Sequence, residues 1–368
     1  MEVRIYSPDF RPRGVLPVLG GTVVLRHNNV STFSIDVNGN SSLADRLDTG
    51  WHIGLYEDGV QHLTGTPDAI TRRSQRGVTD ITLSGRSHMR WLADMITIPT
   101  PSASVTSQGA DSHYKASGPA ERVIRNLVRT HVGQDARAEH RRPLTVDALG
   151  DRGGQVSITS RFQPLLDEVR SLAKVGGTRF FTRMENGRVR FSQNVGMDLS
   201  RAVRLSEVNG AVESWEYTLK APTVTDVLVA GQGEGTARTL RHVSGNTNQW
   251  GVRALVFQDR RDTDDAAELD QAGRETLEDG QESASITLDL IDLPRLRFGK
   301  DFLLGDTITV QVGAGTITDV VQSAEITWGE DGRSVKLQVG PTQEEMDSPG
   351  WVKAVHRLRT GQQILHTT

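Results

Sequence analysis

The chain has 368 residues, with 42 lysines and arginines against 46 aspartates and glutamates, so its net charge is −4. This near balance argues against a nucleic-acid binder, because such proteins present a strongly basic domain. Charged residues make up 24% of the chain, which is average for globular proteins and argues against gross disorder. Cysteine is absent, which excludes disulfides, thiolate nucleophiles and cysteine-bound zinc. We therefore predict a soluble, β-rich protein of roughly two or three domains.

Membrane insertion and export are not expected. No apolar run reaches the roughly 18 residues that a membrane-spanning helix needs. The first residues lack the continuous apolar stretch that follows a basic start in a signal peptide.

The first 98 residues read as short strands separated by turns. Residues 33–37 alternate between apolar and polar side chains, which is typical of a half-buried strand. Between residues 53–56 and 60–63, Glu57-Asp58-Gly59 is a hairpin signal, because glycine adopts a positive φ without strain. Short, evenly spaced strands of this kind are typical of a small barrel or sandwich, and we predict a small β-barrel over residues 1–98.

Residues 99–214 are predicted as a linker followed by an inserted α+β domain. The linker, 99–118, is rich in Pro, Ser and Gly. After it, Val123, Ile124, Leu127 and Val128 form the apolar stripe of a helix that ends at Gly133. A second helix is expected over 162–174, and the Asn-Gly pair at 186–187 predicts a hairpin.

Residues 215–342 return to the β pattern and are predicted as a second β-barrel module. An acidic helical insertion is expected at about 259–298, with its helix over 264–279. The two modules are a weak indication of an internal duplication. The tail, 343–368, carries Trp351, Val352, Val355, Leu358 and Ile364, a pattern typical of one amphipathic helix.

Three short motifs fit ordinary structural roles better than chemical ones. The glycine-rich run 231–235 has Thr236 where a dinucleotide-binding loop needs its third glycine, and residues 236–240 look extended, so we predict a hairpin loop. Residues 262–265, Asp-Thr-Asp-Asp, lack the later glycine of a calcium loop and are predicted to cap a helix. Ser87 and His88 are neighbours on a strand, where side chains point to opposite faces. We predict no catalytic, cofactor-binding or metal-binding residue.

Two oppositely charged segments are candidates for a subunit interface. Arg122, Arg125 and Arg129 share one helical face, and residues 122–142 contain six basic against two acidic residues. Residues 259–282 contain ten acidic against three basic residues. The basic face could bind phosphate, be solvated or contact a neighbouring subunit. The interface residues that we predict are Arg122, Arg125, Arg129, Asp264, Asp265, Glu268 and Trp351.

The order of features in the second half resembles a known family. The run 231–238 is followed by 256–264, by a helix containing Ala272-Gly273-Arg274-Glu275, and by 296–310, in which Leu304-Gly305-Asp306 is the most specific part. This order closely resembles the hub, or minor tail, proteins of long-tailed (siphovirus) actinobacterial phages. The resemblance covers about residues 1–342.

The resemblance implies a structural, non-enzymatic hub in the virion, at the tail tip, assembled in the cytoplasm of the host bacterium. Three chains, each with two related barrels, would form a ring that joins the sixfold distal tail ring to threefold tip or fibre proteins. The implied partners are two further copies of the chain, the distal tail ring, other minor tail or fibre proteins and the C-terminus of the tape-measure protein. DNA would only pass through the channel, and no cofactor is implied. About 26 residues follow the last predicted strand, which we expect to be too few for a catalytic domain.

Two other functions remain open from the residues alone. A tail-associated glycan or peptidoglycan hydrolase would need two carboxylates about 5–9.5 Å apart in a cleft. A module that binds host-surface sugars would need exposed aromatic side chains, for which Trp250 and Trp351 are candidates.

Overall fold

The computed structural model describes residues 1–44, 47–75, 78–109, 111–245, 248–261, 263–313 and 315–341. The described chain is mainly β, which confirms the predicted fold class at that level. It divides into two compact units. Unit 1 consists of Met1–Trp215 and Leu288–Gln338, and unit 2 of Glu216–Thr287 with the chain from Val339. The predicted tail, 343–368, lies outside the described residues.

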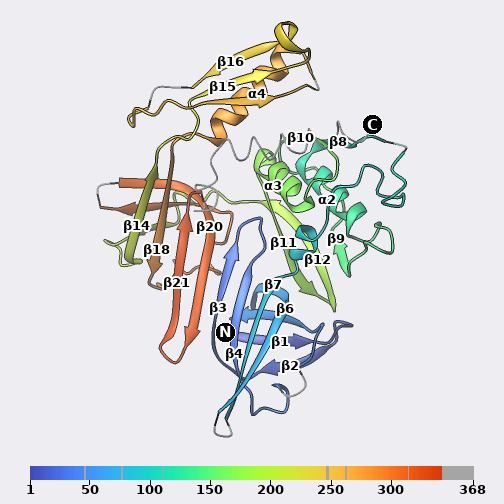
Figure 1. Ribbon diagram of the computed structural model, residues 1–368. Coiled ribbons are helices and arrows are strands. Elements are labelled where there is room, and N and C mark those ends of the chain that lie inside the picture. Colours follow the sequence, from blue (N-terminus) through green and yellow to red (C-terminus); the bar gives the residue numbers. More distant parts are fainter. Residues whose placement is uncertain are drawn as a thin grey trace. The chain divides into compact units, whose positions relative to one another are not determined.

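Seven N-terminal strands of unit 1 pair in the order β3-β4-β7-β6-β5-β1-β2 (Figure 1). Their side chains alternate as predicted: in β4, Phe33, Ile35 and Val37 are buried and Asp36 is exposed. The predicted hairpin between β5 and β6 is confirmed, with positive φ at its two turn residues, 58 and 59. The strands are β1 (Glu2–Tyr6), β2 (Pro12–Leu16), β3 (Val18–Arg26), β4 (Thr32–Asn38), β5 (His52–Glu57), β6 (Val60–Gln75) and β7 (Val78–Ser87).

The C-terminal strands extend this same sheet. β20 pairs antiparallel with β3, with Ile326 opposite Val23, so strands more than 300 residues apart in sequence share one sheet. The chain leaves unit 1 within β14 and returns within β18. The strands are β13 (Arg204–Ser206), β14 (Val212–Lys220), β18 (Ser283–Leu290), β19 (Thr307–Val312), β20 (Gly315–Gly329) and β21 (Gly332–Val339).

The described strands of this sheet follow an open order that ends at β14 and at β2, and no closed barrel is found among them. β2 is poorly suited to accept another strand, because Pro12 has no N–H and Gly14 has a φ of 136°. The two predicted β-barrel modules are therefore not confirmed.

The middle of unit 1 is a helical layer packed on short strands (Figure 1). The predicted stripe of α2 is buried, with Ile124, Leu127 and Val128 at 0% exposure, and it joins α3 and Phe191 in one core. The Asn-Gly hairpin at 186–187 is confirmed. The elements are α1 (Arg90–Ala93), β8 (Tyr114–Pro119), α2 (Ala120–His131), β9 (Leu144–Val146), β10 (Gln155–Ser160), α3 (Leu165–Gly176), β11 (Thr178–Glu185) and β12 (Arg188–Val195).

Two local predictions in this region are wrong. Residues 114–118 of the predicted linker belong to β8, which pairs with β10. The small side chains of Ala116 and Ser117 conceal the alternation that marks a strand. The second helix begins at Leu165 rather than at Phe162, whose φ of 56° is not helical. Pro164 accounts for this start, because proline disfavours a helical conformation in the preceding residue.

Unit 2 contains a three-stranded sheet with one helix. β15 (Asp226–Ala230) is central, antiparallel to β16 (Leu240–Ser244) and parallel to β17 (Leu255–Asp259). α4 (Ala266–Asp279) buries Val227, Val229 and Leu269 completely. The run 231–235 lies in the predicted hairpin loop, but Thr236 is in a 3-10 helix, η2 (Gly235–Ala237), and not in an extended segment.

Candidate interaction surface

The predicted basic face of α2 divides between exposed and buried arginines. Arg122 is exposed and lies 2.7 Å from Asp151. Arg129 is partly exposed and pairs with Asp135. Arg125, in contrast, is only 5% exposed. Arg122 and Arg129 are therefore the members of the predicted set on α2 that lie at the surface of unit 1.

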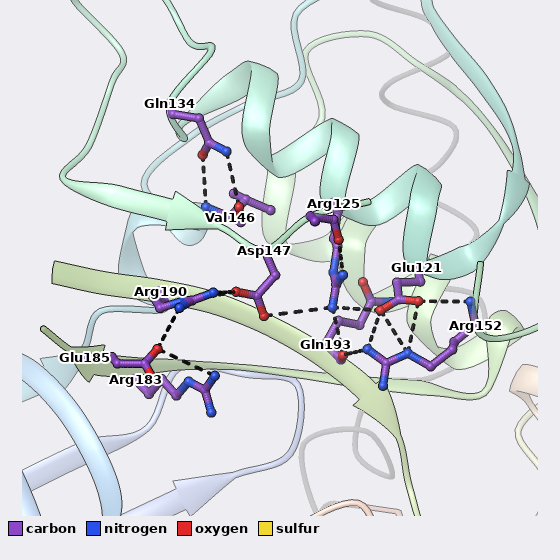
Figure 2. A network of polar contacts seen from close by, with 11 residues as sticks. Glu121, Arg125, Gln134, Val146, Asp147, Arg152, Arg183, Glu185, Arg190 and Gln193 are labelled. Atoms are coloured by element: carbon purple, nitrogen blue, oxygen red, sulfur yellow. Dashed lines mark hydrogen bonds and ion pairs between the residues drawn. The ribbon is translucent and has the colours of Figure 1, made fainter. Parts of the chain in front are cut away.

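Arg125 belongs to a buried network centred on Glu121, which sequence reasoning missed (Figure 2). The Glu121 carboxylate, 1% exposed, lies 2.7 Å from Arg125 and accepts hydrogen bonds from the guanidinium and the backbone N–H of Arg152. Burial acts to raise the pKa of Glu121, but the hydrogen bonds from Arg152 and the charge of Arg125 hold it below its ordinary value. Both arginines also donate to the Gln193 carbonyl. The network fixes α2 to β12 and to the loop at 150–154.

The loop at 150–154 comes close to α2 because it has no side chain at Gly150, where it passes the Glu121 carboxylate. A Cβ at Gly150 would lie 2.2 Å from a Glu121 carboxylate oxygen. The run Gly150-Asp151-Arg152-Gly153-Gly154 was the available sequence signal, because glycines permit such approaches.

The predicted acidic residues surround the start of α4 in unit 2. Asp265 caps the helix, as predicted, by accepting hydrogen bonds from the N–H groups of Ala267 (2.7 Å) and Glu268 (3.2 Å). Asp264 and Glu268 are exposed beside it. Asp262 lies outside the described residues, as does Trp351, so the predicted interface role of Trp351 stays a prediction.

The cap supports a test of what Asp265 contributes. Asp265→Ala leaves two N–H groups at the positive end of α4 without an acceptor, so we expect unit 2 to lose about 1 kcal/mol of unfolding free energy. The matched control is Asp264→Ala, which removes an adjacent exposed carboxylate that does not cap the helix. Urea unfolding of both variants measures the difference, and equal stability would contradict the capping role.

The motif Leu304-Gly305-Asp306 forms a buried anchor in unit 1. Asp306 is completely buried, and its carboxylate accepts hydrogen bonds from Arg179 (2.7 Å) and from the N–H groups of Met197 (3.0 Å) and Leu303 (2.9 Å). The Arg179 guanidinium also donates to the Leu304 carbonyl at 2.7 Å. This anchor ties the start of β19 to β11 and to the segment after β12.

Glycine is required at two positions of this anchor. Gly305 has a φ of 81°, and a Cβ there would lie 2.6 Å from the His27 ring. A Cβ at Gly196 would lie 2.0 Å from the Gly305 carbonyl oxygen. The motif therefore needs glycine at 305 for its positive φ and for the nearby His27 ring, and the Gly305 carbonyl in turn needs glycine at 196.

Strand β14 is an exposed edge of the large sheet. Its only strand neighbour among the described residues is β18. Five consecutive residues, 213–217, are exposed, including Trp215 (40%) and Tyr217 (44%). β14 contains neither proline nor glycine, so it lacks the features that protect β2 from pairing with another strand.

The described part of the chain offers little support for the hydrolase or the sugar-binding alternative. It holds no cluster of three or more His, Asp or Glu side chains that could bind a metal ion. A pocket of about 160 Å³ in unit 1 contains charges that pair with one another: Arg297 lies 3.2 Å from Glu57 and 2.7 Å from Asp58. Trp250 is 45% exposed, and its indole N–H donates to Glu282. None of the described helices has the length and apolar character that a membrane crossing requires.

Three solved structures share this fold over nearly their whole length. The tail protein from Neisseria meningitidis MC58 is 11% identical with a TM-score of 0.59, covering 96% of this chain and 98% of that one. The 43 kDa tail protein of prophage MuSo2 from Shewanella oneidensis is 12% identical with a TM-score of 0.61, and the match covers 94% of this chain and 100% of that one. The prophage tail protein gp18 from Listeria monocytogenes EGD-e is 9% identical with a TM-score of 0.53, and the match covers 97% of this chain and 100% of that one. The chain therefore has the fold of phage tail proteins.

A match of the sequence to a family model identifies the family of this chain. The family model of the siphovirus ReqiPepy6 Gp37-like proteins matches residues 2–341, and the chain belongs to that family. This confirms the predicted resemblance to tail-associated siphovirus proteins. No curated protein matches the sequence.

Proposed function

We propose that the chain is a structural hub at the tail tip of a long-tailed phage, where three copies form a ring. The ring joins the sixfold distal tail ring to threefold tip or fibre proteins and surrounds the channel through which DNA leaves. Each copy contributes two β modules, and the modules complete their barrels across copies. The C-terminus of the tape-measure protein is a further proposed partner, and no enzymatic activity is assigned to the chain.

The family membership and the fold carry this proposal. The family model covers residues 2–341, and the three tail proteins match 94–97% of this chain. Because the similarity extends over almost the entire chain, it supports a tail function for the whole described protein and not for a single domain of it.

The edge of β14 supports assembly into a closed ring. A strand with unpaired N–H and C=O groups and exposed aromatic side chains readily accepts a strand from another chain. A cyclic arrangement gives every copy the same contact. Trp215 is well suited to anchor such a contact, because large aromatic side chains dominate interface energies.

The charged residues predicted as interface residues add a second contact to the proposal. Arg122 and Arg129 lie at the surface on α2, while Asp264, Asp265 and Glu268 lie at the start of α4. Opposite charges at the rim of an interface mainly direct orientation and association rate. We therefore assign these residues a steering role and β14 the larger part of the affinity.

The mass in solution tests the ring directly. Light scattering over a range of concentrations should give three times the 40.3 kDa of one chain. A stable monomer at high concentration would contradict self-assembly of the free protein and direct attention to the sugar-binding and hydrolase alternatives.

A charge on the β14 edge should abolish the trimer. In Trp215→Lys, an ammonium group would have to be buried at the centre of the contact, so we expect monomers under conditions in which the wild type is trimeric. The matched control is Val175→Lys, at a site on α3 that is 71% exposed. Light scattering of both variants gives the result, and a trimeric Trp215→Lys variant would exclude this edge as the interface.

A further inference from the structure

The sequence contains three Asn-Gly pairs, at 38–39, 186–187 and 209–210. Such a pair is chemically unstable, because the backbone nitrogen of the glycine can attack the side-chain amide carbon of the asparagine. Glycine favours this attack, since it has no side chain beside the nitrogen and adopts many backbone conformations. The reaction needs an asparagine side chain that can move and a glycine N–H that no acceptor holds. The three pairs differ in both respects.

The pair at 38–39 is held in place by hydrogen bonds. Asn38 is the last residue of β4, and its side-chain oxygen accepts the N–H of Asn40 at 3.0 Å. Gly39 is buried, and its N–H donates to the Thr79 carbonyl at 3.0 Å. The nitrogen that would attack is therefore already engaged.

The pair at 209–210 is held even more firmly. The Asn209 side chain is fixed at both ends, because its oxygen accepts the N–H of Ala211 at 3.1 Å and its nitrogen donates to the Arg204 carbonyl at 2.7 Å. The Gly210 N–H donates to the Glu207 carbonyl at 3.1 Å. Both reacting groups must therefore lose hydrogen bonds before they can combine.

The pair at 186–187 lacks these restraints. Asn186 and Gly187 are both exposed at the turn between β11 and β12. Among the described residues, the Asn186 side chain makes no hydrogen bond, and the Gly187 N–H donates to no backbone carbonyl. The structure therefore leaves both reacting groups of this pair available.

The charges around this turn favour the reaction as well. Residues 183–190 contain three arginines and one glutamate. Arg190 lies 2.9 Å and Arg183 3.7 Å from Glu185, next to the turn (Figure 2). The attacking nitrogen must lose its proton, and nearby positive charges stabilise the anionic form of a group that does so.

We propose that Asn186 is a site of spontaneous deamidation in the folded chain. The Gly187 nitrogen bonds to the Asn186 side-chain amide carbon, and the amide nitrogen leaves as ammonia together with the proton from Gly187. A cyclic imide results. Solvent water then adds to one of its two carbonyl groups and opens the ring, which gives aspartate or isoaspartate. Either product adds a negative charge to the turn.

The modification alters a contact within unit 1. A Cβ at Gly187 would lie 3.6 Å from the Phe10 carbonyl oxygen, so the turn lies beside the loop between β1 and β2. Isoaspartate also adds a carbon atom to the backbone of a two-residue turn whose geometry requires positive φ at both positions. We therefore expect the isoaspartate form of unit 1 to be less stable than the unmodified chain.

Peptide mass spectrometry of the full chain tests the site. The protein is incubated at mildly alkaline pH and digested with trypsin, which releases residues 184–188, and the mass gain from replacing NH2 by OH is followed. The peptides with Asn38 and Asn209 are the internal controls. Asn186 should react at least about tenfold faster than either, because the hydrogen bonds that must break there raise the barrier. In the chain unfolded by urea, the three should react at similar rates.

Two variants confirm which residue reacts. Asn186→Asp should show no mass gain in the peptide 184–188, whereas Asn209→Asp should leave the gain at Asn186 unchanged. Equal rates at the three pairs of the folded chain would overturn the proposal. An Asn186 that reacts in urea and stays unmodified in the folded chain would also overturn it, because the turn would then protect the pair. None of these results depends on the proposed hub function.

Discussion

Asp306→Ala is expected to lower the unfolding free energy of unit 1 by about 3–5 kcal/mol, the loss typical of breaking a buried ion pair from one side. The substitution leaves the Arg179 guanidinium, which is 10% exposed, without its carboxylate partner. It also leaves the N–H groups of Met197 and Leu303 without their acceptor. A buried charge and two part-buried N–H donors that lose their partners cost more than the pair itself contributes.

A surface ion pair provides the control for this experiment. In Arg122–Asp151, the two side chains are 55% and 61% exposed. Because solvent screens such pairs, Asp151→Ala should cost no more than about 1 kcal/mol. Urea unfolding measures both variants. If Asp306→Ala were as stable as Asp151→Ala, the anchor would have no structural importance.

A double substitution tests whether the unpaired charge of Arg179 is what destabilises Asp306→Ala. In Arg179→Met with Asp306→Leu, no charge remains buried, so the double variant should be more stable than Asp306→Ala alone. A double variant that is less stable than the single one would show that the other hydrogen bonds of Arg179, to the Leu304 carbonyl and to Asn194, outweigh the unpaired charge.

Signals between neighbouring residues predicted most individual elements. The Asn-Gly pair at 186–187 forms a hairpin because both residues adopt positive φ, and the stripe of α2 is buried because its spacing matches the helical period. The cap at Asp265 follows from the same short-range chemistry. These features depend on residues within one or two turns of each other.

Pairings across long stretches of chain were not predicted. Val23 lies opposite Ile326, and nothing in the alternation of either strand identifies the other as its neighbour. From the sequence, Glu121 likewise reads as a surface helix residue and Arg152 as a loop residue. In the structure they form an ion pair in which the Glu121 side chain is buried and the Arg152 side chain is exposed. The family resemblance identified Leu304-Gly305-Asp306 as specific, and only the structure explains it, by the positive φ of Gly305 beside the His27 ring and by the ion pair of Asp306 with Arg179.

Acid should destabilise unit 1 well above the pH at which its carboxylates are protonated, because His131 is held neutral. His131 is 1% exposed, accepts the Ile98 N–H through Nε2 and donates from Nδ1 to the Leu127 carbonyl. Burial lowers its pKa from 6.5 to about 4, and the nearby His140 acts in the same direction. Burial also lowers the pKa of His52 and of His88, and the Nδ1 atom of His52 lies 3.0 Å from the Nε2 atom of His88.

The direction of the effect follows from proton uptake. Between pH 6.5 and about 4, the unfolded chain binds a proton at His131 and the folded chain does not, so the unfolding free energy falls as the pH falls. The difference in pKa corresponds to a loss of about 3 kcal/mol from this residue. Urea unfolding between pH 7.5 and 4.5, followed by hydrogen exchange in α2, measures it.

His131→Gln should remove the part of this pH dependence that His131 contributes, about 3 kcal/mol, because glutamine can accept the Ile98 N–H and does not titrate. The contribution of His52 and His88 should remain. The variant should be less stable than the wild type at pH 7.5 and should lose less stability toward pH 4.5. The matched control, His113→Gln, changes a histidine in the loop before β8 and should keep the wild-type slope. If His131→Gln kept the full slope, the acid sensitivity would belong to the buried His52–His88 pair.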